Sequence, residues 1–464
     1  MDPQVGTRVN RACIALVGML LFAGGCKAPV APARAPNVVL IVMDTLRADR
    51  LDATRNGKAV MPFLSRMAAS GTAYRHAISP SSWTKPTMAS LFTGLPPQAH
   101  GVIYSARQED PAHPTSDRLS EAHVTLAEQL QARGYRTWGY QTNANLTAAL
   151  GFAQGFVPGD YHFANGAPAR QVTDQALDAA AELSAPFFLY AHYMEPHAPY
   201  HVPEGLADAL GPQPGMTAYD REVLDDDGRF MAYYMDQVQT ALGLQPVPTL
   251  PDLSLEGKGA VRHRYDLECL AMDQAIEGLV TGIQAVHPNT VFLFVSDHGE
   301  EFWERGGMGH GTTLYQEQVH VPYFWVGPRV PQQEVKTTVS TQLLGQQLLG
   351  YLDGKVNWDS PESSATVYSF SRGPWPALGV EVEGVYGDGY SYLVDRRTET
   401  TSLFNLERDP AEVQDLAPTA PERVEAFGTL LEEHRALEAG AVDGAPLSEA
   451  DRERLEALGY VDNP

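Results

Sequence analysis

The chain has 464 residues, 44% of them hydrophobic, and a formal net charge of −24 at pH 7. This length is enough for one large domain with a sizeable core and a second, smaller unit. The acidic excess argues against nucleic acid as a partner, because binding to phosphate backbones depends on Lys and Arg. A solvated acidic surface explains the charge most simply, and a site that attracts cations is the alternative.

The first residues have the pattern of an export signal. Two arginines precede the apolar run from Ala12 to Phe22, and small residues then lead to Cys26. About eleven apolar residues span only ~16 Å as a helix, which is too short for a bilayer. Residues 1–25 are therefore predicted to be a signal peptide and residues 26–36 an extended tether. Cys26 resembles the lipid-bearing cysteine of bacterial lipoproteins, although Ala23 stands where that pattern prefers Leu.

This pattern predicts a protein of the cell envelope. We expect a bacterial lipoprotein that contacts the membrane only through an N-terminal lipid, or otherwise a periplasmic or secreted protein.

Continuous apolar runs at 37–43, 187–192 and 291–296 predict strands that are buried on both faces. Between them lie helical patterns that end at Gly or Pro stop signals. These helical patterns cover residues 125–133, 172–183 and 265–286. The alternation of strands and helices predicts an α/β fold with a parallel sheet.

The pattern divides the chain into a main domain at 37–345 and a smaller α+β unit at 346–464. Within the first, residues 200–260 are rich in Pro, Gly and Asp and are predicted to be an insertion. Such an insertion shapes or covers a site, or is a passive surface excursion, and both remain open. The smaller unit is predicted to contain a hairpin at 390–404 and a terminal helix at 447–458.

Acidic side chains follow two of the predicted strands. Asp44 comes directly after the first strand, and Asp297 follows a later one with His298 next to it. Ligand sites in open α/β sheets lie at the carboxyl ends of strands, so these side chains are expected to meet. Asp and His offer oxygen and nitrogen ligands to one divalent ion. Taken singly, each pattern fits a helix cap or a surface turn equally well.

The stretch SPSSWTKPTMASLFTG, residues 79–94, predicts a turn-rich segment that leads into a helix ending at Gly94. The start of a helix offers unpaired N–H groups and a favourable dipole to an anion. A hydroxyl such as that of Thr84 could cap this helix or attack a substrate, and the residues alone leave both functions open.

Taken together and in this order, the motifs resemble the sulfatase branch of the alkaline phosphatase superfamily. The resemblance extends from about residue 36 to 345. The segments that carry it are NVVLIVMDTLRAD (37–49), LFTGLPPQAHG (91–101), LAEQLQARGYRT (126–137), FFLYAHYMEPHAPY (187–200), SDHGE (296–300) and GHGTTLY (309–315). It implies an alkaline-phosphatase-like sandwich, in which a large, mostly parallel sheet lies between helices.

The resemblance also implies one divalent metal, with Ca, Mg, Mn and Zn as the candidates. By motif position its ligands would be Asp44, Asp297 and His298, with Thr84 as a further ligand. Thr45 stands where many sulfatases carry a second Asp. This change removes one hard oxygen ligand and shifts the expected preference towards manganese or zinc.

Thr84 departs from the family pattern in a way that affects the chemistry. Sulfatases carry a Cys-x-Pro-x-Arg motif whose Cys or Ser becomes formylglycine, and TKPTM at 84–88 stands in its place. Thr cannot become formylglycine, so none is expected, and Thr84 is predicted to be a direct, metal-activated nucleophile. A Thr ester has no carbon–oxygen cleavage route for release of sulfate. This favours phosphate or phosphonate esters, whereas the rest of the resemblance favours sulfate.

Other residues receive roles by motif position. His197 is expected to contact the transferred group, and His310 to protonate the leaving oxygen. Lys85 and Asn143 are expected to contact the anion. Ionisable residues that we expect to be structural, or to lie at the surface or behind the ligands, are His192, Glu300 and Glu317.

The sequence thus predicts a metal-dependent hydrolase of a sulfate or phosphate ester on a small molecule, glycan or lipid. One alternative is a transferase that moves a phospho-headgroup within the cell envelope. The other is a non-catalytic protein that binds anionic glycans, an idea motivated by the lost Arg and the lost second Asp.

Overall fold

The computed structural model describes residue 35 onward, apart from the segments 106–114, 245–248, 359–365, 436–442 and 458–464. The predicted signal peptide at 1–25, the lipid site Cys26 and nearly all of the tether lie outside the described residues. Residues 36–464 form one compact unit. No helix among the described residues has the length and apolar character that crossing a bilayer requires.

The centre of this unit is an eight-stranded sheet in the order β14-β4-β13-β10-β1-β9-β7-β8. The strands from β10 to β8 run parallel to one another, and β13 pairs with β10 in the antiparallel direction. The three apolar runs form β1, β9 and β10, as predicted. The strand bounds are β1 Asn37–Met43, β4 Thr72–Tyr74, β7 Arg136–Gln141, β8 Tyr161–Phe163, β9 Phe187–Tyr193, β10 Thr290–Ser296, β13 Tyr323–Val326 and β14 Gln333–Val335.

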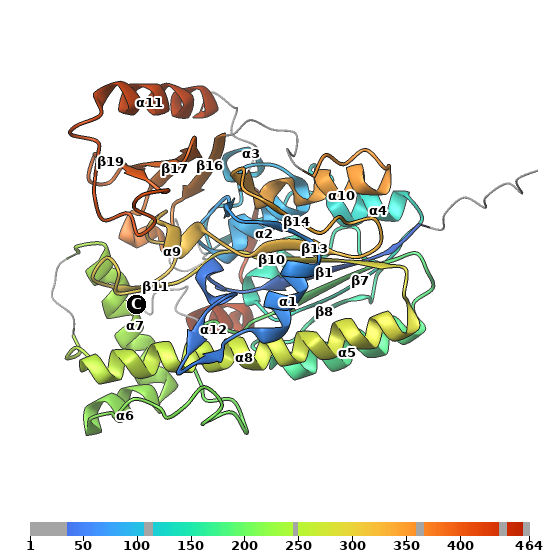
Figure 1. The fold of residues 1–464 in the computed structure, drawn as a ribbon, viewed down its shortest axis with the longest axis horizontal. Coiled ribbons are helices and arrows are strands. Elements are labelled where there is room, and N and C mark those ends of the chain that lie inside the picture. Colours follow the sequence, from blue (N-terminus) through green and yellow to red (C-terminus); the bar gives the residue numbers. More distant parts are fainter. Residues whose placement is uncertain (1–34, 106–114, 245–248, 359–365, 436–442, 458–464) are drawn as a thin grey trace, which may run out of the picture. The chain divides into compact units, whose positions relative to one another are not determined.

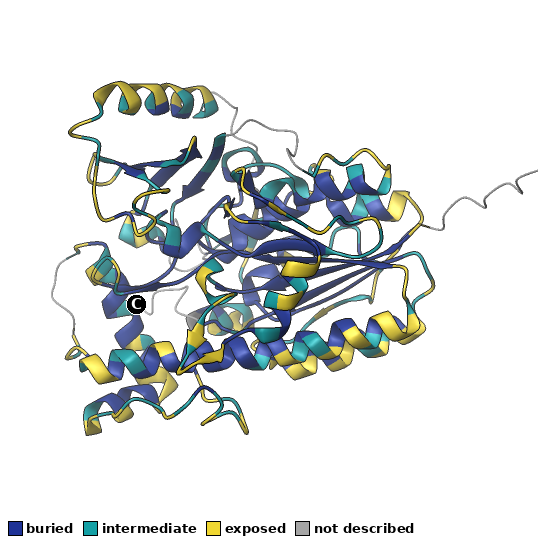
Figure 2. Ribbon diagram, in the orientation of Figure 1, coloured by how far each residue is buried: buried dark blue, intermediate teal, exposed yellow. Residues whose placement is uncertain are grey.

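Helices cover both faces of the sheet and close two hydrophobic cores (Figure 1). On one face lie α1 (Pro62–Ser70), α5 (Ala169–Glu182) and α8 (Leu255–Val286). On the other lie α2 (Thr84–Thr93), α4 (Leu126–Ala132) and α10 (Leu344–Leu352). The predicted helices are confirmed, except that α8 begins ten residues before the predicted start. Figure 2 shows that the strands are buried while the outer faces of α5 and α8 are exposed.

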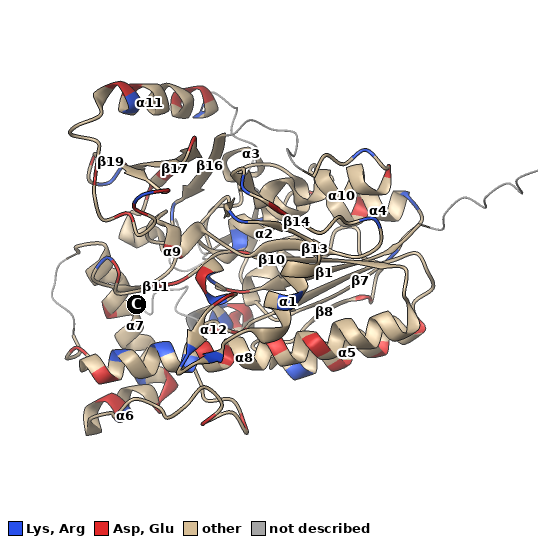
Figure 3. Ribbon diagram, in the orientation of Figure 1, with Lys and Arg blue, Asp and Glu red and all other residues tan. Residues whose placement is uncertain are grey.

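Charged side chains are distributed according to these layers. Figure 3 shows that Lys, Arg, Asp and Glu gather on the helices and loops, whereas the long central strands carry almost none. A charge taken out of water is costly unless it is paired, so carboxylates inside this protein need a specific partner.

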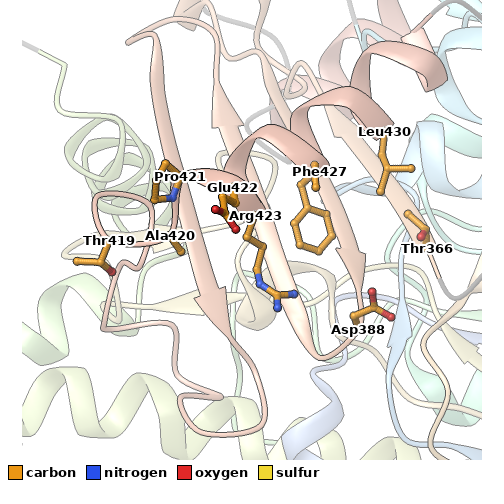
Figure 4. Close-up of a pocket in the computed structure, with 10 residues that line it drawn as sticks. Thr366, Asp388, Thr419, Ala420, Pro421, Glu422, Arg423, Phe427 and Leu430 are labelled. Atoms are coloured by element: carbon orange, nitrogen blue, oxygen red, sulfur yellow. The ribbon is translucent and has the colours of Figure 1, made fainter.

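The C-terminal part contains a separate antiparallel sheet with the order β16-β17-β18-β19. The predicted hairpin is confirmed, because β18 pairs with β19 from Tyr390↔Asn405 to Asp395↔Thr400. Helix α11 packs on this sheet, and a cavity of about 630 Å³ lies between them (Figure 4). The bounds are β16 Thr366–Ser371, β17 Val382–Gly387, β18 Tyr390–Asp395, β19 Thr400–Asn405 and α11 Pro421–Arg435. The domain boundary near residue 345 stays a prediction.

The predicted insertion at 200–260 contains α6 (Ala218–Leu224), α7 (Asp227–Ala241) and the start of α8, joined by loops. The remaining helices are α3 Pro97–His100, α9 Gln316–Val319 and α12 Glu449–Ala457, the last within the predicted terminal helix. The short strands are β2 Thr54–Arg55, β3 Lys58–Ala59, β5 Ala77–Ile78, β6 Thr115–Arg118, β11 Glu301–Phe302, β12 Met308–Gly309, β15 Val339–Ser340 and β20 Asp443–Pro446.

Candidate active site

The parallel pairing of β1 and β10 brings two carboxylates together. Met43 is in register with Ser296, so the next residues, Asp44 and Asp297, leave the sheet side by side. Both are completely buried. Thr45 then turns the chain with a φ of 54°, and its N–H donates to Asp297 Oδ1 at 3.2 Å. This left-handed conformation is uncommon for a β-branched residue and is held here by that contact.

Thr84 is the first residue of α2, and its hydroxyl points at this pair of strand ends. Its Oγ1 lies 3.2 Å from His298 Nε2 and 3.4 Å from Asn143 Nδ2. The N-cap residue is Trp83, and no side chain caps the helix. The hydroxyl of Thr84 is therefore not a helix cap.

Each carboxylate has one satisfied oxygen and one without a partner. Asp44 Oδ2 accepts from Asn143 Nδ2 at 2.9 Å, and Asp297 Oδ1 accepts from the N–H groups of Thr45 and His298. Among the described residues, nothing donates to Asp44 Oδ1 or Asp297 Oδ2. Burial raises the pKa of Asp44 well above its usual value and that of Asp297 to about 7. Two buried carboxylates side by side stay ionised together only with a positive charge between them, and otherwise take up a proton.

Two histidines present lone pairs to the same point. His298 Nδ1 donates to the carbonyl of Gly299 at 2.9 Å, which leaves a lone pair on Nε2. His192 Nδ1 lies 3.1 Å from Thr142 Oγ1, whose own proton goes to the His192 carbonyl. His192 Nε2 therefore also carries a lone pair, and it has no hydrogen-bond partner among the described residues. Burial lowers the pKa of His192 to about 3 and that of His298 well below its usual value.

The donor set fits one divalent cation. Ligand atoms of Asp44, His192 and Asp297 lie within 4.8 Å of one another. His298 Nε2 is 3.5 Å from Asp44 Oδ1 and 3.5 Å from Asp297 Oδ2. The unpartnered atoms of this cluster are two carboxylate oxygens and the Nε2 atom of His192. Mn²⁺ and Zn²⁺ accept both kinds of ligand, whereas Mg²⁺ and Ca²⁺ prefer the oxygens.

His310 is held by a buried carboxylate. Its Nδ1 lies 3.1 Å from Glu300 Oε1 and 3.0 Å from the hydroxyl of Tyr234. Tyr234 and Tyr200 also donate to Glu300, at 3.1 and 2.7 Å. Burial raises the pKa of Glu300, but the charge of His310 and these hydrogen bonds outweigh it, so the pKa lies below its usual value. Glu300 is therefore an anion that fixes the proton of His310 on Nδ1.

The histidine rings form a continuous group that reaches the carboxylates. The His310 ring is 4.5 Å from that of His298 and 5.1 Å from that of His197. His197 Nδ1 donates to the carbonyl of Ala198 at 2.6 Å, which fixes its ring. Burial lowers the pKa of His197 to about 4.

Lys85 is placed differently from the other predicted site residues. Its Nζ donates to the carbonyl of Tyr104 at 3.2 Å and to the hydroxyl of Ser116. These acceptors explain how a lysine can be completely buried, and its contact with an anion stays a prediction. Glu317 lies apart from the cluster in an ion pair with Arg305 at 2.7 Å.

Comparison with known proteins places this geometry in a family. A model of the sulfatase family matches residues 36–354, more than half of the chain. The chain belongs to the sulfatase family. It is therefore an enzyme of the sulfuric ester hydrolase type, as its motifs indicated. The solved structures that superpose on it share its alkaline-phosphatase-like fold.

Relatives of this sulfatase-family chain differ in what they do. Arylsulfatase K of Gallus gallus is 24% identical, over 90% of this chain and 86% of its own length. The low-salt glycan biosynthesis sulfotransferase Agl7 of Haloferax volcanii is also 24% identical, over 92% and 96%. The solved structure of the phosphonate monoester hydrolase SpPMH of Silicibacter pomeroyi superposes with a TM-score of 0.65, at 17% identity over 86% and 95% of the two chains.

Sequence reasoning missed several side chains at this sulfatase-family site. His192 was expected to be structural, yet its Nε2 lies 3.6 Å from Asp44 Oδ2, because β9 runs beside β1. Glu300 was expected at the surface or behind the ligands; the structure excludes the surface and places it behind His310. Tyr200 and Tyr234 carried no signal that could have found them. Tyr234 comes from α7, so the segment 200–260 supplies a side chain to the site.

Proposed function

We propose that this protein is a metal-dependent hydrolase of a sulfate or phosphate ester with Thr84 as its nucleophile. The observation that supports this most is the direction of the Thr84 hydroxyl, which meets His298 and Asn143 beside two buried carboxylates. A structural threonine at the start of a helix would cap it or contact the backbone instead.

The cation would be held by Asp44, Asp297 and His298 together with the Thr84 hydroxyl. His192, whose Nε2 faces the same cluster, is a further candidate ligand. When bound, such a cation polarises an ester oxygen and lowers the pKa of a hydroxyl that it contacts.

The chain's own residues then divide the remaining tasks. Asn143 donates to Thr84 Oγ1 and so aims a lone pair of that oxygen at the sulfur or phosphorus. The positive end of the α2 dipole stabilises the negative charge of the transferred group. His197 contacts that group. His310, oriented by Glu300, gives a proton to the leaving oxygen.

The bonds balance in two steps. Thr84 reacts as its alkoxide, having lost its hydroxyl proton to solvent, and Oγ1 bonds to sulfur or phosphorus. The ester oxygen leaves with a proton from doubly protonated His310, which becomes neutral. Water then attacks the same atom and gives one proton to His310, and Thr84 leaves as the alkoxide. Because resolution requires attack at the central atom, phosphate and phosphonate esters suit Thr84 better than sulfate esters.

A substrate panel tests this proposal. Purified protein is assayed with Mn²⁺, Zn²⁺, Ca²⁺ or Mg²⁺ against 4-nitrophenyl sulfate, 4-nitrophenyl phosphate and phenyl phenylphosphonate. We expect turnover that EDTA abolishes, with the phosphorus esters preferred. Absence of turnover on every ester, with metal bound, would refute hydrolysis and favour the non-catalytic alternative.

Group transfer is the second candidate, because the relative from Haloferax volcanii is named a sulfotransferase. The same assay separates the two functions. Hydrolysis releases one inorganic anion for each nitrophenol, whereas transfer to an added acceptor alcohol releases nitrophenol without the anion.

Replacing His310 by asparagine should slow esters with poor leaving groups far more than 4-nitrophenyl esters. A general acid contributes about 10²- to 10⁴-fold when the leaving oxygen must be protonated, and little when nitrophenolate leaves unaided. Rates on alkyl and 4-nitrophenyl esters measure this ratio. The matched control is His162→Asn, on the exposed part of β8. An equal loss on both classes would contradict the assignment of His310.

We also propose that the protein is exported and acylated at Cys26. The mass of the mature N-terminus tests this, because an acylated species that begins at Cys26 should be absent from a Cys26→Ser variant. An unmodified mature N-terminus elsewhere would point to a periplasmic or secreted protein.

A further inference from the structure

A large cavity adjoins the catalytic histidines. It has a volume of about 1040 Å³ and lies between the loop that follows β9, the start of α5 and the middle of α8. His197 lines this cavity, and its ring meets that of His310 edge to face. The cavity is therefore continuous with the residues that handle the transferred group, and its volume is that of a small-molecule site.

Two carboxylates in the wall of this cavity each have an oxygen without a donor. Glu268 is only 5% exposed, and its Oε1 accepts from the N–H of His201 at 2.7 Å. Glu195 Oε1 accepts from the N–H of Ala169 at 2.7 Å. The Oε2 atoms of both side chains are buried, and no described residue donates to either.

Among the described residues, no Lys or Arg forms an ion pair with either carboxylate, although the charge of Arg264 acts on Glu268. Arg264 is the nearest buried cation on α8, but its guanidinium binds the Leu224 carbonyl and pairs with Asp225 at 2.5 Å. Arg170 lines the cavity but is exposed and lies 3.9 Å from Asp174.

Burial and the charge of Glu195 accordingly raise the pKa of Glu268 well above its usual value, and burial also raises that of Glu195. An arrangement of this kind is costly in the free protein and is relieved by a bound cation.

We propose that this cavity receives the leaving-group part of the ester, and that Glu195 and Glu268 bind an ammonium group on it. The substrate class is then an ester of an amino alcohol or amino sugar. This inference rests on the proposed function, because it takes the cavity as the continuation of that active site.

The chemistry of the wall favours an organic ammonium over a metal ion. An ammonium group donates three hydrogen bonds and is matched by two anionic acceptors, whereas Ca²⁺ takes six to eight oxygen ligands. The cluster of potential metal ligands found among the described residues is Asp44, His192 and Asp297, not this pair. The apolar side chains of Met194, Pro199 and Leu206 offer contacts to a carbon skeleton.

Product-like alcohols test the inference without requiring turnover. Glucosamine and ethanolamine are compared with glucose and ethylene glycol as ligands of the full-length protein, by thermal shift and by inhibition of 4-nitrophenyl ester hydrolysis. We expect glucosamine or ethanolamine to raise Tm and to inhibit competitively, and the neutral alcohols to do neither at the same concentration.

Single substitutions test whether Glu268 and Glu195 are the groups that bind the ammonium ligands. Glu268→Gln and Glu195→Gln each keep an oxygen for the backbone N–H but lose the charge, and each should weaken ammonium binding about tenfold or more. The matched control, Glu256→Gln, changes an exposed carboxylate in the first turn of α8 and should leave the affinity unchanged.

Equal binding of neutral and ammonium ligands, or unchanged affinity in both Gln variants, would overturn the inference. If the esters are hydrolysed without any preference for ammonium, the inference fails and the proposed function stands. If ammonium ligands bind through Glu268 while no ester is hydrolysed, the proposed function fails, but the inference that the cavity binds an ammonium group stands.

Discussion

Thr84→Ala should lower kcat/KM by at least about 10³-fold on every ester that the protein cleaves. The alanine lacks the oxygen that forms the covalent bond, and neither His298 nor Asn143 can supply it. Because no hydrogen bond from Thr84 caps α2, the variant should keep its fold and its Tm within a few degrees. Steady-state kinetics and thermal unfolding measure the two quantities.

Two further variants make this test specific. Thr84→Ser keeps a hydroxyl and should retain a substantial part of the rate, with a covalent adduct at residue 84 detectable by mass spectrometry after acid quenching. Thr93→Ala alters the last residue of the same helix, where the hydroxyl donates to the Ala89 carbonyl, and should leave the rate unchanged. If Thr84→Ala were as active as the wild type, the nucleophile would have to be another group.

The ends of the central strands show what the sequence could establish. Asp44 and Asp297 were expected to meet because each follows an apolar run of a parallel sheet, and β1 does pair with β10. His192 sits at the end of an equally apolar run. Its proximity to Asp44 depends on β9 being the other neighbour of β1, and strand order cannot be read from hydrophobic pattern.

The side-chain positions that the sequence could not predict depend mostly on polar contacts between residues far apart in the chain. Glu300 is held as an anion by His310 and by hydrogen bonds from Tyr200 and Tyr234, which lie 66 or more residues away in the chain. Lys85 is buried because Tyr104 and Ser116 accept its hydrogen bonds. Such pairs leave no periodic trace in a single sequence, whereas helices and strands do.

Because Asp44 and Asp297 are buried side by side, a bound cation should stabilise the folded protein. Adding Mn²⁺ or Ca²⁺ to metal-free protein should raise Tm, by an amount that corresponds to about 2.7 kcal/mol at a metal concentration of 100 times Kd. Asp297→Asn keeps an oxygen for the N–H groups of Thr45 and His298 but removes the charge that a cation needs. This variant should therefore lose the metal-dependent rise in Tm, together with turnover.

In metal-free protein, the Tm of Asp297→Asn relative to that of the wild type should rise with pH. The pKa of Asp297 is raised by burial to about 7 in the folded state, from a usual value of 3.8. The folded state thus holds this proton more tightly, and the stability that Asp297 contributes is complete below about pH 4 and is lost as the pH rises towards 7. Asparagine does not ionise. The Tm of Asp297→Asn relative to wild type should accordingly be higher at pH 8 than at pH 5, by roughly 2 °C or more.

Asp273→Asn is the matched control for this experiment. Asp273 is also buried, it accepts the N–H groups of Phe63 and Leu64, and burial raises its pKa to about 6. Its replacement should reproduce the pH trend over a slightly lower range and leave the metal response intact, because no proposed ligand is changed. If Asp297→Asn kept the full metal response, Asp297 would not be a ligand, and the cation would have to lie elsewhere in the cluster.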